Sequence, residues 1–245
     1  MLKTMVGIQL ISGTSNKSLA EEISSLVNIP LTPVVIKNFA DGEKYVRVKS
    51  TVRGENVFII QSVCPPVNDN LMELLILIDS VKRGGARQIN VIAPYLGYSR
   101  QDRKSKSREP ISAKLIANMI TIAGASRLLI YDLHADQIQG FYDIPVDHFL
   151  GFSIFAKYLS DEKLQNIVVV SPDVGGVKRA NRLADHMRVP IAIIDKVRVQ
   201  HNQSEVAHLV GDVKGKTAII IDDIIDTGGS ICNASNEVKI GRAHV

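Results

Sequence analysis

The residues best suited to chemistry form a short run of carboxylates, glycines and hydroxyls after the apolar segment 218–221. They are Asp222, Asp223, Asp226, Thr227, Gly228, Gly229 and Ser230. In an open parallel sheet, ligands bind beyond the carboxyl ends of the strands. Glycines let the backbone approach a ligand, and the free N–H groups that open a helix attract phosphate. The first two carboxylates would repel a phosphate but could hydrogen-bond sugar hydroxyls beside it. The run therefore predicts a sugar-phosphate site. The alternative is an ordinary strand–turn–helix corner capped by Ser230.

A basic loop is the second candidate, and it follows the apolar run Ile89–Ala93. Five cations fall within the nine residues from Arg100 to Arg108, with small polar residues between them. Such a loop attracts anions. A solvated basic loop is the alternative, but the position at a strand end favours a triphosphate role.

Two other strand ends carry candidate metal ligands. His134 follows Leu128–Tyr131 and stands between two aspartates, and Asp173 follows Ile167–Val170 just before two glycines. Histidine and carboxylate groups can ligate a divalent cation or hold its waters. A hydrogen-bonded structural histidine is the alternative for His134 alone. Together these residues predict Mg²⁺ with phosphates at the edge of a sheet.

Lys196 and Arg198 follow the expected strand Ile191–Ile194. In an extended segment, residues two apart project from the same side. Both cations would then reach charge developing on a transferring phosphoryl group. An exposed basic loop is the alternative.

A tight turn is expected at Phe39–Glu43, because Asp41-Gly42 favours a sharp bend. The Phe39 ring would be suited to stacking on a flat base. A β-turn with Phe39 in the core is the alternative.

Apolar β-branched strands alternate with helical patterns along the chain, which predicts α/β sheets that are mostly parallel, with right-handed crossovers. The expected strands are Val57–Gln61, Ile89–Ala93, Leu128–Tyr131, Ile167–Val170, Ile191–Ile194 and Thr217–Ile221. The expected helices follow Asn68–Asn70, span Ile111–Ala123 and run near Ser153–Leu159. Their inward faces would carry Leu71, Leu74, Leu75 and Ile78 in the first, and Leu115, Ile116, Met119 and Ile120 in the second. Two such alternating runs predict two domains, residues 1–151 and 152–239.

Composition excludes several classes of function. The 245 residues suffice for two domains of about 100 to 150 residues, and the net charge of +4 is too small to argue for nucleic acid. No window approaches the roughly 18 apolar residues of a membrane helix, and the first residues show no signal peptide. Cys64 and Cys232 lie far apart without metal-ligand spacing, and we expect them to be buried or inert thiols in a reducing cytoplasm.

These motifs in this order resemble the ribose-phosphate diphosphokinase family, also called phosphoribosyl-pyrophosphate synthetases. The resemblance extends from about Gly7 to Glu237. It is carried by Phe39–Glu43, Asn68–Glu73, Tyr95–Arg103, Asp132–Gly140, Ser171–Gly176, Asp195–Arg198 and Asp222–Ser230. The last run alone would indicate only the wider phosphoribosyltransferase-like group, whereas the full set is specific.

The resemblance implies two phosphoribosyltransferase-like domains, an N-terminal one on the ATP side and a C-terminal one on the ribose 5-phosphate side. The implied reaction moves the β,γ-diphosphoryl group of ATP to the anomeric hydroxyl of ribose 5-phosphate, with AMP as the leaving group. It also implies Mg²⁺, a cytoplasmic location, and a homo-oligomer that is at least a dimer and in its larger form a hexamer. A non-catalytic regulatory subunit of the same family is the alternative, although such relatives should lose catalytic elements that this chain keeps.

The resemblance also assigns residue roles. ATP would be held by Phe39, Asp41 and Glu43, at the adenine and from a neighbouring subunit, and by Arg100, Gln101, Asp102 and Arg103. Mg²⁺ would be bound by His134 and Asp173. Ribose 5-phosphate would be bound by Asp222, Asp223 and Asp226–Ser230. Lys196 and Arg198 would stabilise the transition state from a mobile loop.

The chain departs from the family pattern in two places. Many bacterial members carry Lys-Arg-Arg-Pro-Arg where this chain has Lys196-Val-Arg198-Val-Gln200, which affects one ATP contact rather than the reaction. Family members also continue well past the end of this chain. We interpret residues 240–245 as a non-native tail, because codons for Ile-Gly-Arg-Ala-His-Val match a common sequencing-library adapter. We therefore expect a truncated second domain and a chain that is poorly stable and inactive, with a natural short form as the alternative.

Overall fold

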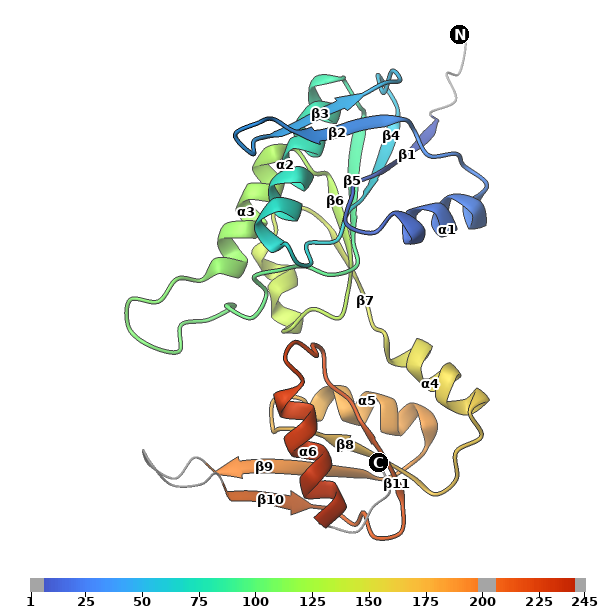
Figure 1. Ribbon diagram of the computed structural model, residues 1–245, viewed down its shortest axis with the longest axis vertical. Helices are drawn as coiled ribbons and strands as arrows, with labels where there is room; N and C mark the ends of the chain where they lie inside the picture. The colour runs from blue at the N-terminus through green and yellow to red at the C-terminus, as the bar shows by residue number, and fades with distance from the viewer. Residues whose placement is uncertain (1–6, 198–205, 241–245) are drawn as a thin grey trace. The chain divides into compact units, whose positions relative to one another are not determined.

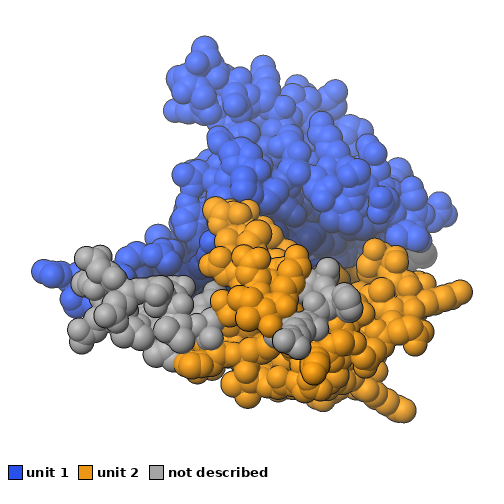
Figure 2. Space-filling model, turned by 60° about the horizontal axis from the view of Figure 1, so that its bottom comes forward, with its two compact units in different colours: residues 1–149 blue, residues 150–245 orange. Residues whose placement is uncertain are grey.

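The computed structural model describes residues 7–197 and 206–240. The chain divides between Phe149 and Leu150 into two compact units, drawn in blue and orange in Figure 2. Each unit has a central sheet of its own and buried residues of its own beneath its helices. Both sheets are parallel or mostly parallel, which confirms the α/β class expected from the alternating pattern.

Unit 1 is built on a five-stranded sheet in the order β1-β4-β5-β6-β7 (Figure 1). Its strands are β1 (Ile8–Ser12), β4 (Asn56–Ile60), β5 (Gln88–Ala93), β6 (Arg127–Tyr131) and β7 (Val146–Phe149). Each strand pairs in parallel with its neighbour. The expected strands in this half lie within one residue of β4, β5 and β6, while β1 and β7 were not predicted. All five carboxyl ends therefore meet at one edge of the sheet, where ligands bind in such folds.

Helices cover both faces of this sheet. α2 (Val67–Arg83) and α3 (Ser112–Ala123) lie on one face and α1 (Lys17–Val27) on the other (Figure 1). The main core packs beneath α2 and α3 and includes Leu74 and Ile120, which are fully buried. A short 3₁₀ helix, η1 (Asp136–Phe141), connects β6 to β7.

A separate antiparallel hairpin lies against α2. It consists of β2 (Val34–Asn38) and β3 (Lys44–Val48), which pair with each other as a two-stranded sheet. The sequence pattern predicted the turn between them but not the strands. The residues that face the core alternate along each strand: Val34 and Ile36 in β2, and Val46 and Val48 in β3, pack partly buried against the main core. This alternation is typical of a half-buried strand.

The inward face of α3 differs from the expectation at one position. Ile116 and Ile120 are buried, but Leu115 is 58% exposed. Ala113 and Ala117 complete the buried stripe, so the contacts follow an i, i+3, i+4, i+7 pattern through small residues. Leu115 was wrongly assigned to the core because large apolar side chains occur around most of this helix.

Unit 2 is built on a four-stranded sheet in the order β10-β9-β8-β11. Its strands are β8 (Ile167–Ser171), β9 (Ile191–Val197), β10 (Val206–Val210) and β11 (Thr217–Ile220). β8 pairs in parallel with both β9 and β11, and β10 adds an antiparallel edge. The three strands expected in this half correspond to β8, β9 and β11, whereas β10 was not anticipated.

Two helix layers bury both faces of the second sheet. α6 (Gly229–Ile240) packs on one face, and α4 (Phe152–Asp161) and α5 (Val177–Met187) pack on the other. In β8, Val168 and Val170 face the α6 layer while Val169 faces the other. A strand buried on both sides has the continuous apolar run from which β8 was predicted. In the described part of the chain, no helix is both long and apolar enough to cross a membrane.

Candidate functional site

The carboxylate run of unit 2 lies where two neighbouring parallel strands end. β11 pairs with β8, and the Ile221 N–H continues the ladder with a hydrogen bond of 3.1 Å to the Val170 carbonyl. Asp222 and Asp223 follow β11, and Asp173 follows β8. The parallel pairing thus places the Ser171–Gly176 segment and the Asp222–Ser230 segment at the same edge, as the sequence pattern predicts.

Arg179, from the first turn of α5, pairs with both adjacent carboxylates. Its Nη1 lies 3.3 Å from Asp223 Oδ1 and 3.6 Å from Asp222 Oδ1. The three side chains are largely buried, with exposed fractions of 19% for Arg179, 15% for Asp222 and 9% for Asp223. An Arg between two carboxylates offsets their mutual repulsion and fixes their positions. Sequence reasoning missed this residue, whose only signal is a cation just after the Gly175-Gly176 pair.

The Asp222 carboxyl is held in an environment that disfavours its charge. Burial, together with the side-chain hydrogen bond to Asp223 and the charges of Asp223 and Asp173, raises its pKa from the ordinary 3.8 to about 6. The Asp223 N–H donates to Asp222 Oδ1 at 2.8 Å and works in the opposite direction. Burial is the largest of these influences, so the net result is a raised pKa for Asp222 although Arg179 lies beside both carboxylates.

The loop from Asp226 to Ser230 turns directly into α6. Gly228 adopts a φ of +76°, a conformation that side chains of L-residues rarely adopt, and α6 begins at Gly229. A Cβ at Gly228 would meet nothing within 4 Å, so the requirement for glycine is conformational and the space around it is open. Asp226 and Thr227 are exposed. An exposed turn that presents the first N–H groups of a helix is suited to a phosphate group.

The catalytic candidates lie at the end of β9. Lys196 is paired through its backbone with Ala207 of β10, so the chain is extended at this residue. Arg198 falls outside the described residues, as do Val199 and Gln200. The proposed roles of Lys196 and Arg198 stay predictions.

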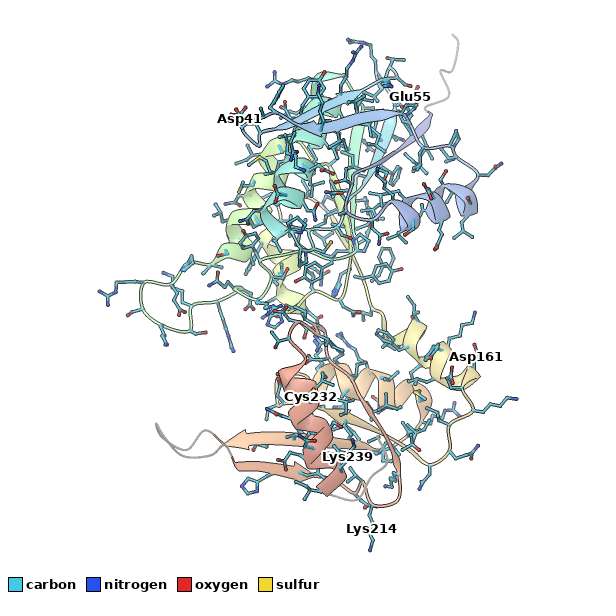
Figure 3. All side chains as sticks on the ribbon, in the orientation of Figure 1. Asp41, Glu55, Asp161, Lys214, Cys232 and Lys239 are labelled. Atoms are coloured by element: carbon cyan, nitrogen blue, oxygen red, sulfur yellow. The ribbon has the colours of Figure 1, made fainter. Side chains whose placement is uncertain are left out.

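In unit 1, the Phe39–Glu43 turn closes the β2–β3 hairpin. The Phe39 N–H donates to the Glu43 carbonyl at 2.8 Å, and the Gly42 N–H donates to the Phe39 carbonyl at 3.0 Å. Asp41 Oδ1 accepts the Glu43 N–H at 3.1 Å, which fixes the bend, and Gly42 has a φ of +96°. Figure 3 labels Asp41 at the tip of this turn.

Phe39 itself is 49% exposed and stacks edge-on against Tyr45, with ring centroids 5.6 Å apart. It does not belong to the core, so the alternative of a turn with a core phenylalanine is wrong. An accessible ring held in one orientation is suited to stacking against a base.

The basic loop after β5 is tied to two neighbouring elements. Gln101 Oε1 accepts a hydrogen bond of 2.6 Å from the Ser112 hydroxyl, and the Gln101 carbonyl accepts one of 3.1 Å from the Ala113 N–H at the start of α3. Asp102 Oδ2 accepts a hydrogen bond of 3.2 Å from Gln137 Nε2 in η1. Arg100 and Arg103 are exposed. The loop after β5 and the loop after β6 therefore meet, as expected from the adjacent carboxyl ends of these strands.

His134 is exposed in the loop after β6. The preceding Leu133 N–H donates a hydrogen bond of 3.0 Å to Nε2 of His148 in β7, which holds this loop against the neighbouring strand. Asp132 adopts a φ of +39°, so the chain bends sharply just before His134. The loop geometry thus presents the imidazole at the carboxyl edge of the sheet.

His134 belongs to unit 1 and Asp173 to unit 2, and each offers one donor group that fits Mg²⁺ only as part of a larger shell. Between residues 7 and 197 and between 206 and 240, no three His, Cys, Asp or Glu side chains gather closely enough to hold a metal together. Mg²⁺ is commonly bound by one or two protein groups, with waters and substrate phosphates completing the shell. Asp173 is exposed, and its Oδ1 accepts the Gly176 N–H at 2.8 Å, which orients the carboxylate.

Comparison with known proteins identifies the family. Residues 8–124 match the model of the N-terminal domain of ribose phosphate pyrophosphokinase, and residues 151–244 match that of the phosphoribosyl transferase domain. A ribose-phosphate pyrophosphokinase of Clostridium perfringens is 55% identical, over 95% of this chain and 74% of that protein. The corresponding enzyme of Bacillus caldolyticus is 54% identical, over 94% and 73%. The chain belongs to the ribose-phosphate pyrophosphokinase family.

A solved member of the family has the same fold. The crystal structure of phosphoribosylpyrophosphate synthetase from Mycobacterium smegmatis matches with a TM-score of 0.91 and 42% identity, over 97% of this chain and 78% of that one. The likeness therefore extends over both compact units. Within unit 2 the carboxylates and the exposed glycine turn lie together at the end of β11, and within unit 1 the basic loop lies at the end of β5.

Proposed function

We infer that this chain carries the activity of its family, the transfer of the diphosphoryl group of ATP to ribose 5-phosphate. The anomeric hydroxyl oxygen forms a bond to the β-phosphorus, the bond from that phosphorus to the α-phosphate oxygen breaks, and the hydroxyl proton is released. The products are 5-phosphoribosyl 1-diphosphate and AMP, for nucleotide biosynthesis. The observation that carries this inference is 55% identity to a named enzyme over 95% of the chain. Neither the Clostridium nor the Bacillus relative is named as a regulatory subunit.

For ribose 5-phosphate we propose a division of work at the end of β11. Asp222 and Asp223 hydrogen-bond the sugar hydroxyls, and the turn from Asp226 through Thr227, Gly228 and Gly229 to Ser230 holds the 5-phosphate. The Arg179 pairing supports this division, because it restrains the two carboxylates where they can reach hydroxyls. The open space around Gly228 supports the phosphate position.

For ATP we propose contacts from two parts of unit 1. Phe39, Asp41 and Glu43 recognise the adenine, supported by the exposed Phe39 ring. Arg100, Gln101, Asp102 and Arg103 hold the nucleotide, supported by the place of this loop at the carboxyl end of β5. We further propose that the adenine turn serves a neighbouring copy, in a cytoplasmic homo-oligomer of at least two and up to six subunits.

We propose His134 and Asp173 as residues that would bind Mg²⁺, and the ion would supply positive charge to offset that of the phosphates. Lys196 and Arg198 stabilise the charge of the transferring group. Diphosphoryl transfer depends on positioning and charge stabilisation more than on a covalent nucleophile. The corresponding domains are residues 1–151 for ATP and 152–239 for ribose 5-phosphate.

The reaction is tested by measuring AMP formation from ATP in the presence and absence of ribose 5-phosphate. The parent for this test is the chain restored to the length of its family members, because we expect the 245-residue chain to be inactive. That parent should form AMP only with both substrates, and Lys196→Ala should reduce its turnover by at least about a hundredfold, the loss expected for a residue that stabilises transition-state charge. Binding of ribose 5-phosphate, measured by calorimetry, should persist in this variant. Lys214→Ala changes an exposed lysine of the same unit, labelled in Figure 3, and serves as the matched control.

Two results would contradict these proposals separately. Full turnover in Lys196→Ala would remove its catalytic role while leaving the reaction intact. A parent that binds neither substrate would contradict the function assigned to the chain.

A further inference from the structure

Glu73 is a fully buried carboxylate to which the reaction assigns no role. It lies in the middle of α2 with 0% exposure. Its Oε1 accepts the Thr14 N–H at 2.6 Å, and the Thr14 hydroxyl lies 2.9 Å from Oε1 and 2.8 Å from Oε2. A buried charge is costly unless it is paired and hydrogen-bonded. The hydrogen bonds to Thr14 satisfy part of that requirement.

Lys44 supplies the opposite charge. Its Nζ lies 3.3 Å from Glu73 Oε2, and the lysine side chain is only 14% exposed. Lys44 is the first residue of β3 and follows the Phe39–Glu43 turn directly. Removing one partner of a buried ion pair would leave the other charge buried without compensation. The folded chain therefore strongly favours keeping the contact between Lys44 and Glu73. The ion pair thereby connects the turn to the middle of α2.

The hairpin depends on such a connection. β2 and β3 form a two-stranded sheet of their own among the described strands. An isolated two-stranded hairpin is at best marginally stable in water. Its apolar residues pack against the core beside α2, but the turn residues Phe39, Asp41 and Glu43 are exposed. The Lys44–Glu73 pair is therefore an anchor one residue from the turn.

Packing alone does not hold this end of the hairpin. A cavity of about 390 Å³ opens beside it, with Thr14, Asn38 and Lys44 in its lining. Asn38, the last residue of β2, is paired with Lys44 across the hairpin, so both strand ends border the cavity. Where side chains are not tightly packed, hydrogen bonds and ion pairs determine where the backbone lies.

We propose that Lys44 and Glu73 form a positioning pair that holds the Phe39–Glu43 turn in its adenine-binding arrangement. This proposal rests on the proposed adenine role of the turn. Neither residue touches the nucleotide. Their effect is transmitted through the backbone of β3, and misplacing a recognition element by about 1 Å is enough to weaken binding or rate by up to about a hundredfold.

The test compares Lys44→Met, Lys44→Arg and the parent as full chains. Measured by calorimetry, Lys44→Met should weaken ATP binding about tenfold and change ribose 5-phosphate binding by no more than about twofold. Lys44→Arg keeps the positive charge and should therefore retain most of the parent's ATP affinity. Hydrogen exchange of the Phe39 and Gly42 amides in the absence of nucleotide should accelerate in Lys44→Met alone. Lys49→Met alters an exposed lysine just after β3 and is the matched control.

The outcomes separate the two proposals. If Phe39→Ala leaves ATP binding unchanged, the adenine role of the turn is wrong whatever Lys44 does. If Phe39→Ala weakens ATP binding but Lys44→Met changes neither binding nor amide exchange, the positioning pair is overturned. Equal loss of both substrates in Lys44→Met, with a lowered unfolding midpoint, would also overturn it by indicating general destabilisation.

Discussion

Asp222 carries its negative charge at a cost to the folded state. Its pKa is raised to about 6, chiefly by burial, from an ordinary 3.8. Between these two pH values the folded chain binds the proton more tightly than the unfolded chain. The stabilisation from this proton is complete below pH 3.8 and is lost as the pH rises through about 6. At pH 8 the ionised carboxylate therefore opposes folding. Burial deprives this carboxylate of water, and the hydroxyl groups of a bound sugar would supply the missing hydrogen-bond donors.

Asp222→Asn should consequently raise the stability of unit 2 at pH 8. We expect a gain of about 1 to 2 kcal/mol in urea unfolding, which shrinks towards zero as the pH is lowered to 4. Asp212→Asn is the control, because hydrogen bonding to Lys216 lowers the pKa of that exposed carboxyl and the substitution should give no gain at pH 8. A less stable Asp222→Asn variant at pH 8 would contradict the assigned sign.

At the scale of elements, α3 shows that an apolar residue of an apolar helix is not always buried. Ile120 is fully buried, whereas Leu115 on the same helix is 58% exposed. Ile120→Ala should destabilise unit 1 by about 2 to 5 kcal/mol, because it leaves a cavity in the core. Leu115→Ala should change stability by no more than about 0.5 kcal/mol. Urea unfolding followed by circular dichroism compares the two, and similar losses would show that the exposed face of α3 is covered in solution.

Some elements could be predicted from the sequence and others could not, for physical reasons. β8 is a nearly continuous apolar run because both faces are covered, and β5 is interrupted inside the strand only by the buried Asn90, so both were easily recognised. The β2–β3 hairpin is half-buried and interrupted by charges, so only its turn was recognisable. Arg179 is an ordinary helical arginine in sequence, and only the fold brings it to Asp223. The position of the carboxylate run between a strand and a helix was predictable, because it follows the apolar segment 218–221 and its glycines precede α6.

At the scale of the whole molecule, unit 1 has a core made of its own residues. The unit 1 core draws on α2, α3 and all five strands of its sheet. A fragment of residues 1–149 should therefore fold alone and unfold in one cooperative transition. A fragment of residues 1–126 lacks β6 and β7, exposes the edge of β5, and should fail to do so. Circular dichroism in urea compares the fragments, and a non-cooperative transition in the longer one would contradict the independence of unit 1.

Cys232 lies one turn into α6, and its N–H donates to the Gly228 carbonyl at 2.9 Å. It is exposed, so of the expected alternatives, a buried or an inert thiol, burial does not apply to it; Cys64 is half-buried and is the only other cysteine in the chain. Figure 3 labels its position. A thiol-reactive fluorophore would therefore attach preferentially beside the glycine turn without any substitution. The sequence thus provides its own spectroscopic reporter for ligand binding at the Asp226–Ser230 turn, where we propose that the sugar phosphate binds.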